Sequence, residues 1–176
     1  VERSRGLGDV YKRQRLASMH AFDFEHEQAI ELLGRAKDIA EAAGEDGPRL
    51  WALGFLALCH TAIGELELGY EEFRRVHDEA SALGQVYVAF NTLYNEMEER
   101  SITFDAREAL RLADRFDRDY PQFPAGLQSS LGRTFAYFAL GALSESLVNA
   151  ERVIEMGRES GVTTYGFWAR LDAVAC

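Results

Sequence analysis

The sequence predicts an all-α protein in which about four helix pairs stack into an α–α superhelix, a right-handed solenoid. Composition favours helix, because proline occurs only 3 times among 176 residues and alanine, leucine and glutamate are abundant. Similar segments also recur along the chain at spacings of 40, 40 and 37 residues, headed by Ala29, Gly69, Ala109 and Ser146. Repeats of this length are typical of stacked helical units.

Each recurring segment carries an apolar stripe at helical spacing. The stripe positions lie four and then three residues further on, at Leu33, Phe73, Ala113, Ala150, Ala36, Val76, Phe116 and Val153. These offsets place the stripe on one face of a helix. Three of the segments end at a glycine (Gly44, Gly84 and Gly161), which can take the left-handed conformation that closes a helix.

Other segments of helical period lie between these, at residues 48–63, 85–100, 126–140 and 162–175. Pro48 suits the first turn of a helix, and Pro121 and Pro124 belong to a connection. The chain therefore reads as helix pairs, with units at about 15–44, 48–84, 85–121 and 124–161 and the start of another at 162–176. The third unit is expected to have a longer internal connection, "ERSITFD".

The stretch "AIGELELGYEEF" (62–73) predicts a turn inside a helix hairpin. Gly64 allows the backbone to reverse without a Cβ clash. Glu65 and Glu67 would stand at the next helix N-terminus, where the helix dipole favours negative charge. Gly69 would let the paired helices pack closely, and "GAL" at 141–143 repeats the turn.

This pattern resembles the tetratricopeptide repeat, in its looser form of about 40 residues, over residues 15–176. Its first helix usually carries a large residue, a leucine and then a small residue, and Leu53, Leu56, Ala57 and His60 fit that phase. In the fourth unit the phase places Ser130 and Arg133 at core positions, which leaves the register of that first helix open. The resemblance specifies fold well and function poorly.

The wording of "AIELLGRAKDIAEAAG" and "AIGELELGYEEF" also resembles the repeat arm of bacterial LuxR-type and maltose-activator-type ATPase regulators, and of cyclase-linked ATPase proteins. That resemblance implies a nucleotide-binding module before the repeats and an output domain after them. Residues 1–14 resemble translated sequencing-adapter read-through, with a natural disordered arm as the alternative, and are set aside as a non-native segment. We expect residues 15–176 to be a repeat domain truncated at both ends.

The formal net charge of −10 argues against a sequence-independent grip on nucleic acid, which needs clustered lysine and arginine. No apolar run reaches the roughly 20 residues that span a bilayer, and no signal peptide is evident, so we expect a cytoplasmic protein without membrane contact. Cys59 and Cys176 form no CxxC pair. Cys59 is expected to be a small buried hydrophobe.

Motifs for catalysis, cofactors or metals are not found in the sequence. No GxxxxGK[ST], GxGxxG or GxSxG occurs, and "HEQAIE" at 26–31 lacks the second histidine of a zinc site. The sequence therefore predicts no enzyme, no cofactor and no metal site. Tyr87, Phe90 and Tyr94 could form a nucleotide-stacking row, but their helical spacing without basic neighbours favours inter-repeat core.

The resemblance implies that the first helix of each pair lines a concave groove. The groove candidates are Trp51, Leu58, Thr61, Asn91, Asn95, Glu98, Gln128 and Phe135. Asn91, Asn95 and Glu98 follow one another at spacings of four and three, so they share a polar face that either binds a peptide or simply faces water.

We therefore expect a non-catalytic interaction and scaffold module, part of a bacterial signalling or transcription-regulator protein. Its partner would be a protein, a peptide or another domain of the same chain. The alternative is a small-molecule sensing domain that binds an inducer in the groove.

Overall fold

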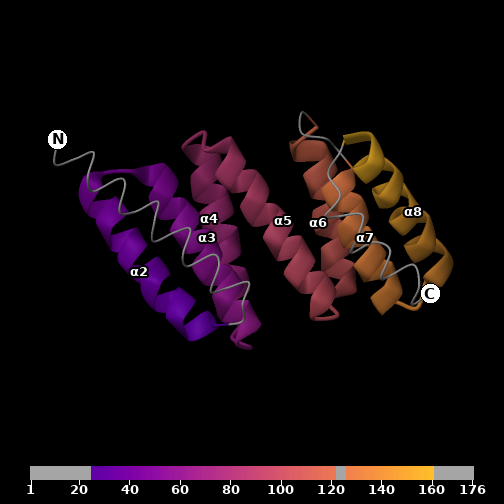
Figure 1. Cartoon of the computed structure of the whole chain (residues 1–176), viewed down its shortest axis with the longest axis horizontal. Helices are drawn as coiled ribbons and strands as arrows, with labels where there is room; N and C mark the ends of the chain where they lie inside the picture. Colours follow the sequence, from indigo (N-terminus) through magenta and orange to yellow (C-terminus); the bar gives the residue numbers. More distant parts are fainter. Residues whose placement is uncertain (1–24, 122–125, 161–176) are drawn as a thin grey trace. The chain divides into compact units, whose positions relative to one another are not determined.

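The computed structural model describes residues 25–121 and 126–160, and every regular element in these ranges is an α-helix. The helices are α2 (His26–Ala43), α3 (Asp46–Ala62), α4 (Leu66–Ala82), α5 (Val86–Ile102), α6 (Ala106–Asp119), α7 (Leu127–Ala139) and α8 (Leu143–Ser160) (Figure 1). The prediction of an all-α chain is confirmed. The expected non-native segment at 1–14 and the expected further helix at 162–175 lie outside the described residues.

The chain divides into two compact units, residues 1–92 and residues 93–176. Within the first unit, α2 packs against α3 and α3 packs against α4. Within the second, α6 packs against α7 and α7 packs against α8. Helix α5 begins in the first unit and ends in the second.

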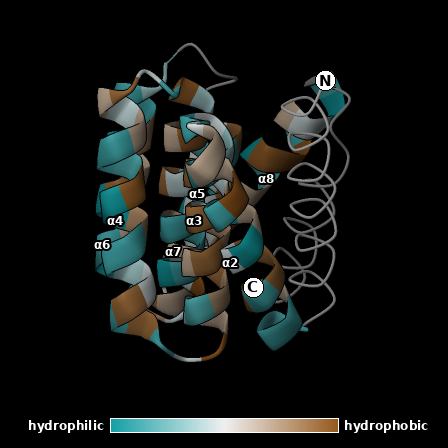
Figure 2. Ribbon diagram, turned by 90° about the vertical axis from the view of Figure 1, so that its left-hand side faces the viewer, coloured by the Kyte–Doolittle hydropathy of each residue, from teal (hydrophilic) through white to brown (hydrophobic). Residues whose placement is uncertain are grey.

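The predicted apolar stripe forms the core of each described pair. All of its positions are buried: Leu33, Ala36, Phe73, Val76, Ala113, Phe116, Ala150 and Val153. Figure 2 shows hydrophobic and hydrophilic residues alternating along the described helices, as expected when one face of each helix packs inward. Within the part of the chain that the structure describes, no helix is long and apolar enough to cross a membrane.

Among the described helices, five ends share one hydrogen-bonded turn, in which a residue with positive φ closes the helix. Gly44, Gly64, Gly84 and Gly141 occupy that position in four of the turns, with φ between 66° and 92°. In the fifth, Phe104 occupies it with φ 65°. Its N–H donates to the Ser101 carbonyl at 3.4 Å, and the next N–H donates to the Arg100 carbonyl at 2.8 Å.

The expectation of a longer third connection is wrong. Helix α5 ends at Ile102 and α6 begins at Ala106, so the turn has the same length as the turn between α3 and α4. The short turn could not be recognised from the sequence, because its left-handed residue is Phe104 and not a glycine.

Gly69 holds α4 close to α3, as predicted. A Cβ built on Gly69 would lie 2.8 Å from the Ala57 carbonyl oxygen and 2.4 Å from Thr61 Cγ2. The other details predicted for this hairpin are also present: Glu65 occupies the position before the first residue of α4, Glu67 lies in the first turn, and Gly64 has the positive φ of the reversal.

The structure settles the register of α7, which the sequence left open. Leu127, Ser130, Leu131 and Thr134 are buried, so the core face runs along them. Arg133 instead bridges to α6, where it donates to Asp114 at 2.7 Å and to Asp117 at 2.8 Å.

Candidate functional site

Three of the predicted groove residues lie on α3 in the first unit. Trp51 is half-buried and stacks on Phe55, with ring centroids 4.1 Å apart. Leu58 is half-buried and packs against Ala57, Tyr70 and Phe73. Thr61 is only 4% exposed, and its hydroxyl donates to the Leu58 carbonyl at 2.8 Å. Of the three, Trp51 and Leu58 therefore offer more surface to a partner than Thr61 does.

The polar row predicted on α5 is present at the expected helical spacing. Asn91 and Glu98 are half-buried, whereas Asn95 is 9% exposed. Asn91 and Asn95 both interact with other parts of the chain, so they are held in place and not freely solvated. Asn91 and Glu98 are thus each more exposed than Asn95.

Glu98 is the electrostatically unusual member of this row. Burial raises the pKa of its carboxyl to about 7, the like charge of Glu99 adds to the rise, and a hydrogen bond with Tyr94 opposes it. A carboxyl with such a pKa exists in both protonation states near neutral pH. It can therefore either accept or donate a hydrogen bond when a ligand approaches.

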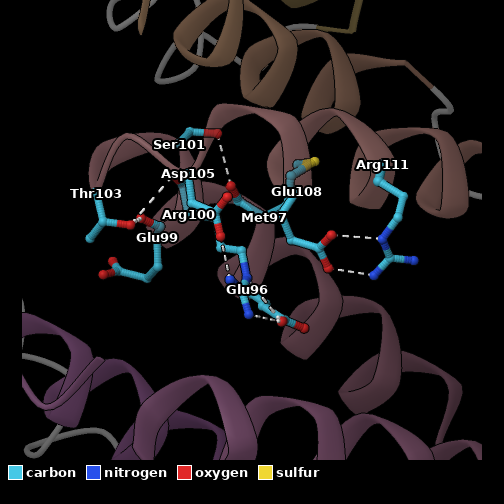
Figure 3. A network of polar contacts seen from close by, with 9 residues as sticks. All are labelled: Glu96, Met97, Glu99, Arg100, Ser101, Thr103, Asp105, Glu108 and Arg111. Carbon is cyan, nitrogen blue, oxygen red and sulfur yellow. Dashed lines mark hydrogen bonds and ion pairs between the residues drawn. The ribbon is translucent and has the colours of Figure 1, made fainter. Parts of the chain in front are cut away.

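Sequence reasoning missed a polar network at the end of α5, drawn in Figure 3. Glu96 is 2% exposed, and its Oε1 accepts from Nε and Nη2 of Arg100, each at 3.3 Å. Arg100 also donates to Asp105 in the turn before α6. Burial works to lower the pKa of Arg100, but the hydrogen bond with Asp105 and the negative charges of Glu96 and Asp105 outweigh burial, so the pKa is raised.

This network fixes the end of α5 and is not an open site. Its sequence signal was the spacing of four residues between Glu96 and Arg100, which is the spacing of a helical ion pair. The spacing could not reveal that Glu96 is buried. In the same region Arg111 pairs with Glu108 along the surface of α6 (Figure 3).

Two predicted groove residues lie on α7 in the second unit. Phe135 is half-buried and packs against the core of Leu127, Leu131, Ala150 and Val153. Gln128 is half-buried, and its Oε1 is buried without a hydrogen-bond partner. An unsatisfied buried carbonyl is unfavourable, so a hydrogen bond donated by a ligand to Gln128 Oε1 would be stabilising.

The aromatic row on α5 is only partly core. Phe90 and Tyr94 are 7% and 9% exposed, as the core interpretation predicts, but Tyr87 is 64% exposed. For Tyr87 that interpretation is wrong. Tyr87 lies in the first turn of α5 and stacks on Phe90, with ring centroids 6.3 Å apart.

Metal-binding clusters and reactive nucleophiles are absent from the part of the chain that the structure describes. Within 25–121 and 126–160, no group of three histidine, cysteine or acidic side chains is arranged to hold a metal ion. Cys59 is buried, as predicted, and burial raises the pKa of its thiol to about 11. The thiolate is therefore disfavoured at neutral pH.

No family model and no curated protein matches the chain. Among solved structures, it is similar to a protein from Podosopora anserina described as a kinesin light chain with nearly identical TPR-like repeats. The match has a TM-score of 0.67 at 16% identity and covers 98% of this chain and 85% of the other. The fold is that of TPR-like helical repeats.

Proposed function

We propose that this chain is a non-catalytic binding module that recognises a protein or peptide partner through partly exposed residues of its first helices. The observation that carries the proposal is the polar row of Asn91, Asn95 and Glu98 on α5. Its two half-buried members supply one amide group (Asn91) and one carboxyl group (Glu98), and a peptide can hydrogen-bond to both kinds of group. Within the first unit, Trp51 and Leu58 on α3 offer separate, partly exposed apolar contacts of the kind that anchor interfaces.

Glu98 favours a partner that carries a basic side chain. A lysine or arginine placed beside the carboxyl would favour its charged form and offset part of the burial that raises its pKa. A charge-assisted hydrogen bond of this kind is stronger than a neutral one. The chain's net charge of −10 would also speed the approach of a basic partner.

A random peptide library selected against the chain tests this function. Peptides enriched in lysine or arginine should emerge, and Glu98→Gln together with Asn91→Ala should weaken their binding at least about tenfold. Arg74→Ala is the matched control, because Arg74 is exposed on the second helix of its pair and should leave binding unchanged. Selection that yields no peptide, or peptides indifferent to the α5 variants, would count against the proposal.

The alternative function is the sensing of a small molecule. It is favoured by Glu98 and its hydrogen bond with Tyr94, because a half-buried carboxyl can bind a ligand hydroxyl or amine. Calorimetry and thermal shift against a broad metabolite panel separate the two functions. A metabolite that gives binding heat and a thermal shift with wild type, but neither with Glu98→Gln, would support sensing. If no metabolite gives either signal and the peptide selection succeeds, peptide binding is supported.

The biological setting that we propose is the regulatory arm of a bacterial signal-transduction or transcription-regulator protein. It is supported by the TPR-like fold and by the resemblance of segments such as "AIELLGRAKDIAEAAG" to the repeat arms of such regulators. Sequencing outward from both ends of the reading frame tests it. A nucleotide-binding module upstream with an output domain attached is the expected result, and a long array of repeats alone would contradict it.

A further inference from the structure

The turn between α5 and α6 departs from its counterparts in two ways. Phe104 takes the left-handed position that glycine occupies in the other four turns, and its side chain is 76% exposed. A non-glycine residue in this conformation is strained. A side chain so exposed gains little packing within the chain to offset that strain. Strain that persists without internal compensation points to a function for the side chain outside its own fold.

Phe104 does not stand alone at this end of the second unit. Ala106 and Ala109, in the first turn of α6, pack against Ala136 near the end of α7, which brings the α5–α6 turn beside the α7–α8 turn. Both turns lie at the lower ends of their helices in Figure 1. The apolar residues exposed there are Ile102, Phe104, Phe138, Leu140 and Leu143, and we call this set the turn edge.

The turn edge also carries two charged side chains of opposite sign. Arg107 lies in the first turn of α6 and Glu145 in the first turn of α8. Both are exposed, and neither forms an ion pair or side-chain hydrogen bond with any residue in the described ranges. The Ser146 hydroxyl donates to the Thr134 carbonyl at 2.9 Å, which ties the first turn of α8, and Glu145 with it, to the same end of α7.

We propose that two copies of this chain associate through the turn edge, with Phe104 as the anchor of each copy and Arg107 of one facing Glu145 of the other. A two-fold interface needs a surface that is complementary to itself, and an apolar patch with one free positive and one free negative charge meets that need. The acidic remainder of a chain with net charge −10 repels its copy. The turn edge, whose two free charges cancel, is where such copies can meet.

Sedimentation of the whole 176-residue chain over about 1–100 μM tests the proposal, since a weak interface of this kind is populated in that range. Wild type should form a reversible dimer. Phe104→Glu and Phe104→Gly should each weaken it at least about thirtyfold, as expected on loss of an aromatic anchor. Phe104→Gly should also raise the thermal stability of the monomer, because it removes the strain, so its loss of dimer could not be attributed to unfolding.

Tyr87→Glu is the matched control, because Tyr87 is also a highly exposed aromatic residue, at 64%, but lies in the first turn of α5. It should leave the dimer unchanged. Arg107→Glu and Glu145→Arg should each weaken the dimer, and the two combined should restore it. A chain that stays monomeric throughout, a dimer insensitive to Phe104, or a failure of the charge swap to restore the dimer would overturn the proposal. So would a monomer that uses Phe104 to bind a different protein.

Discussion

Replacing Gly69 with alanine should destabilise the first unit, even though alanine is the better helix former. The new Cβ would lie 2.8 Å from the Ala57 carbonyl oxygen and 3.1 Å from the Thr61 amide nitrogen. Both are backbone atoms of α3, so no rotation of a side chain can relieve the contact. The remaining neighbour, Thr61 Cγ2 at 2.4 Å, can move only if the hydroxyl of Thr61 gives up its bond to the Leu58 carbonyl.

The size of the effect follows from three terms. Exchange of glycine for alanine inside a helix contributes about 1 kcal/mol of stability. Overpacking against fixed neighbours costs about 1–3 kcal/mol, and loss of the Thr61 hydrogen bond costs about 0.5–1.5 kcal/mol more. The free energy of unfolding should therefore fall by about 0.5–3.5 kcal/mol.

Urea denaturation followed by circular dichroism measures this change. Gly34→Ala is the matched control, because Gly34 lies inside α2 and a Cβ there would have no atom within 4 Å. It should stabilise the chain by about 1 kcal/mol, so the two variants should move in opposite directions. If Gly69→Ala is as stable as Gly34→Ala, the close approach of α3 and α4 is not what Gly69 provides.

Three further outcomes are expected. Phe73→Ala should lower the free energy of unfolding by about 3–5 kcal/mol, because Phe73 is fully buried between α3 and α4; a loss under about 1 kcal/mol in urea denaturation would mean that it is not core. Phe104→Gly should raise the free energy of unfolding by up to about 1.5 kcal/mol, because the strain relieved, about 1–2 kcal/mol, exceeds the entropic cost of glycine, about 0.5–1 kcal/mol; an unchanged melting temperature would argue against backbone strain at that turn. Folding raises the pKa of Glu98 from 4.5 to about 7, so its contribution to stability is lost as pH rises through that window. The melting temperature of Glu98→Gln should therefore rise relative to that of wild type as pH increases from 5 to 8. A difference between the two melting temperatures that stays constant over this range would contradict the prediction.

The existence and order of the helices could be predicted from the sequence because the apolar stripe and the closing glycines agree. The recurring segments are headed by Gly69, Ala109 and Ser146, whereas the second helices begin three residues earlier, at Leu66, Ala106 and Leu143. The small residue marks where one helix touches its neighbour. The helix start is set earlier, by the turn that follows the left-handed residue.

Less of the candidate site could be predicted, because helical periodicity shows which residues share a face of a helix but not how deeply each of them is buried. The spacing of Asn91, Asn95 and Glu98 predicted one polar face, but it could not show that Asn95 is 9% exposed while Asn91 is half-buried. Depth depends on the size of side chains on neighbouring helices, which lie far away in sequence. The raised pKa of Glu98 has its largest cause in the same burial, so it too was beyond a reading of spacing.

The positions that indicate a function are those where a residue departs from the pattern of the repeat at a cost in stability. A turn closed by glycine, or a stripe residue such as Phe73, does what every unit needs for folding and says nothing about a partner. Phe104 costs stability where glycine would cost none, and Glu98 places a carboxyl where burial opposes its charge. Departures from local consistency are expected at functional positions. If both prove neutral for binding and self-association while their replacements stabilise the fold, these departures serve no interaction, and the partner must be sought on the regular surfaces of the repeats.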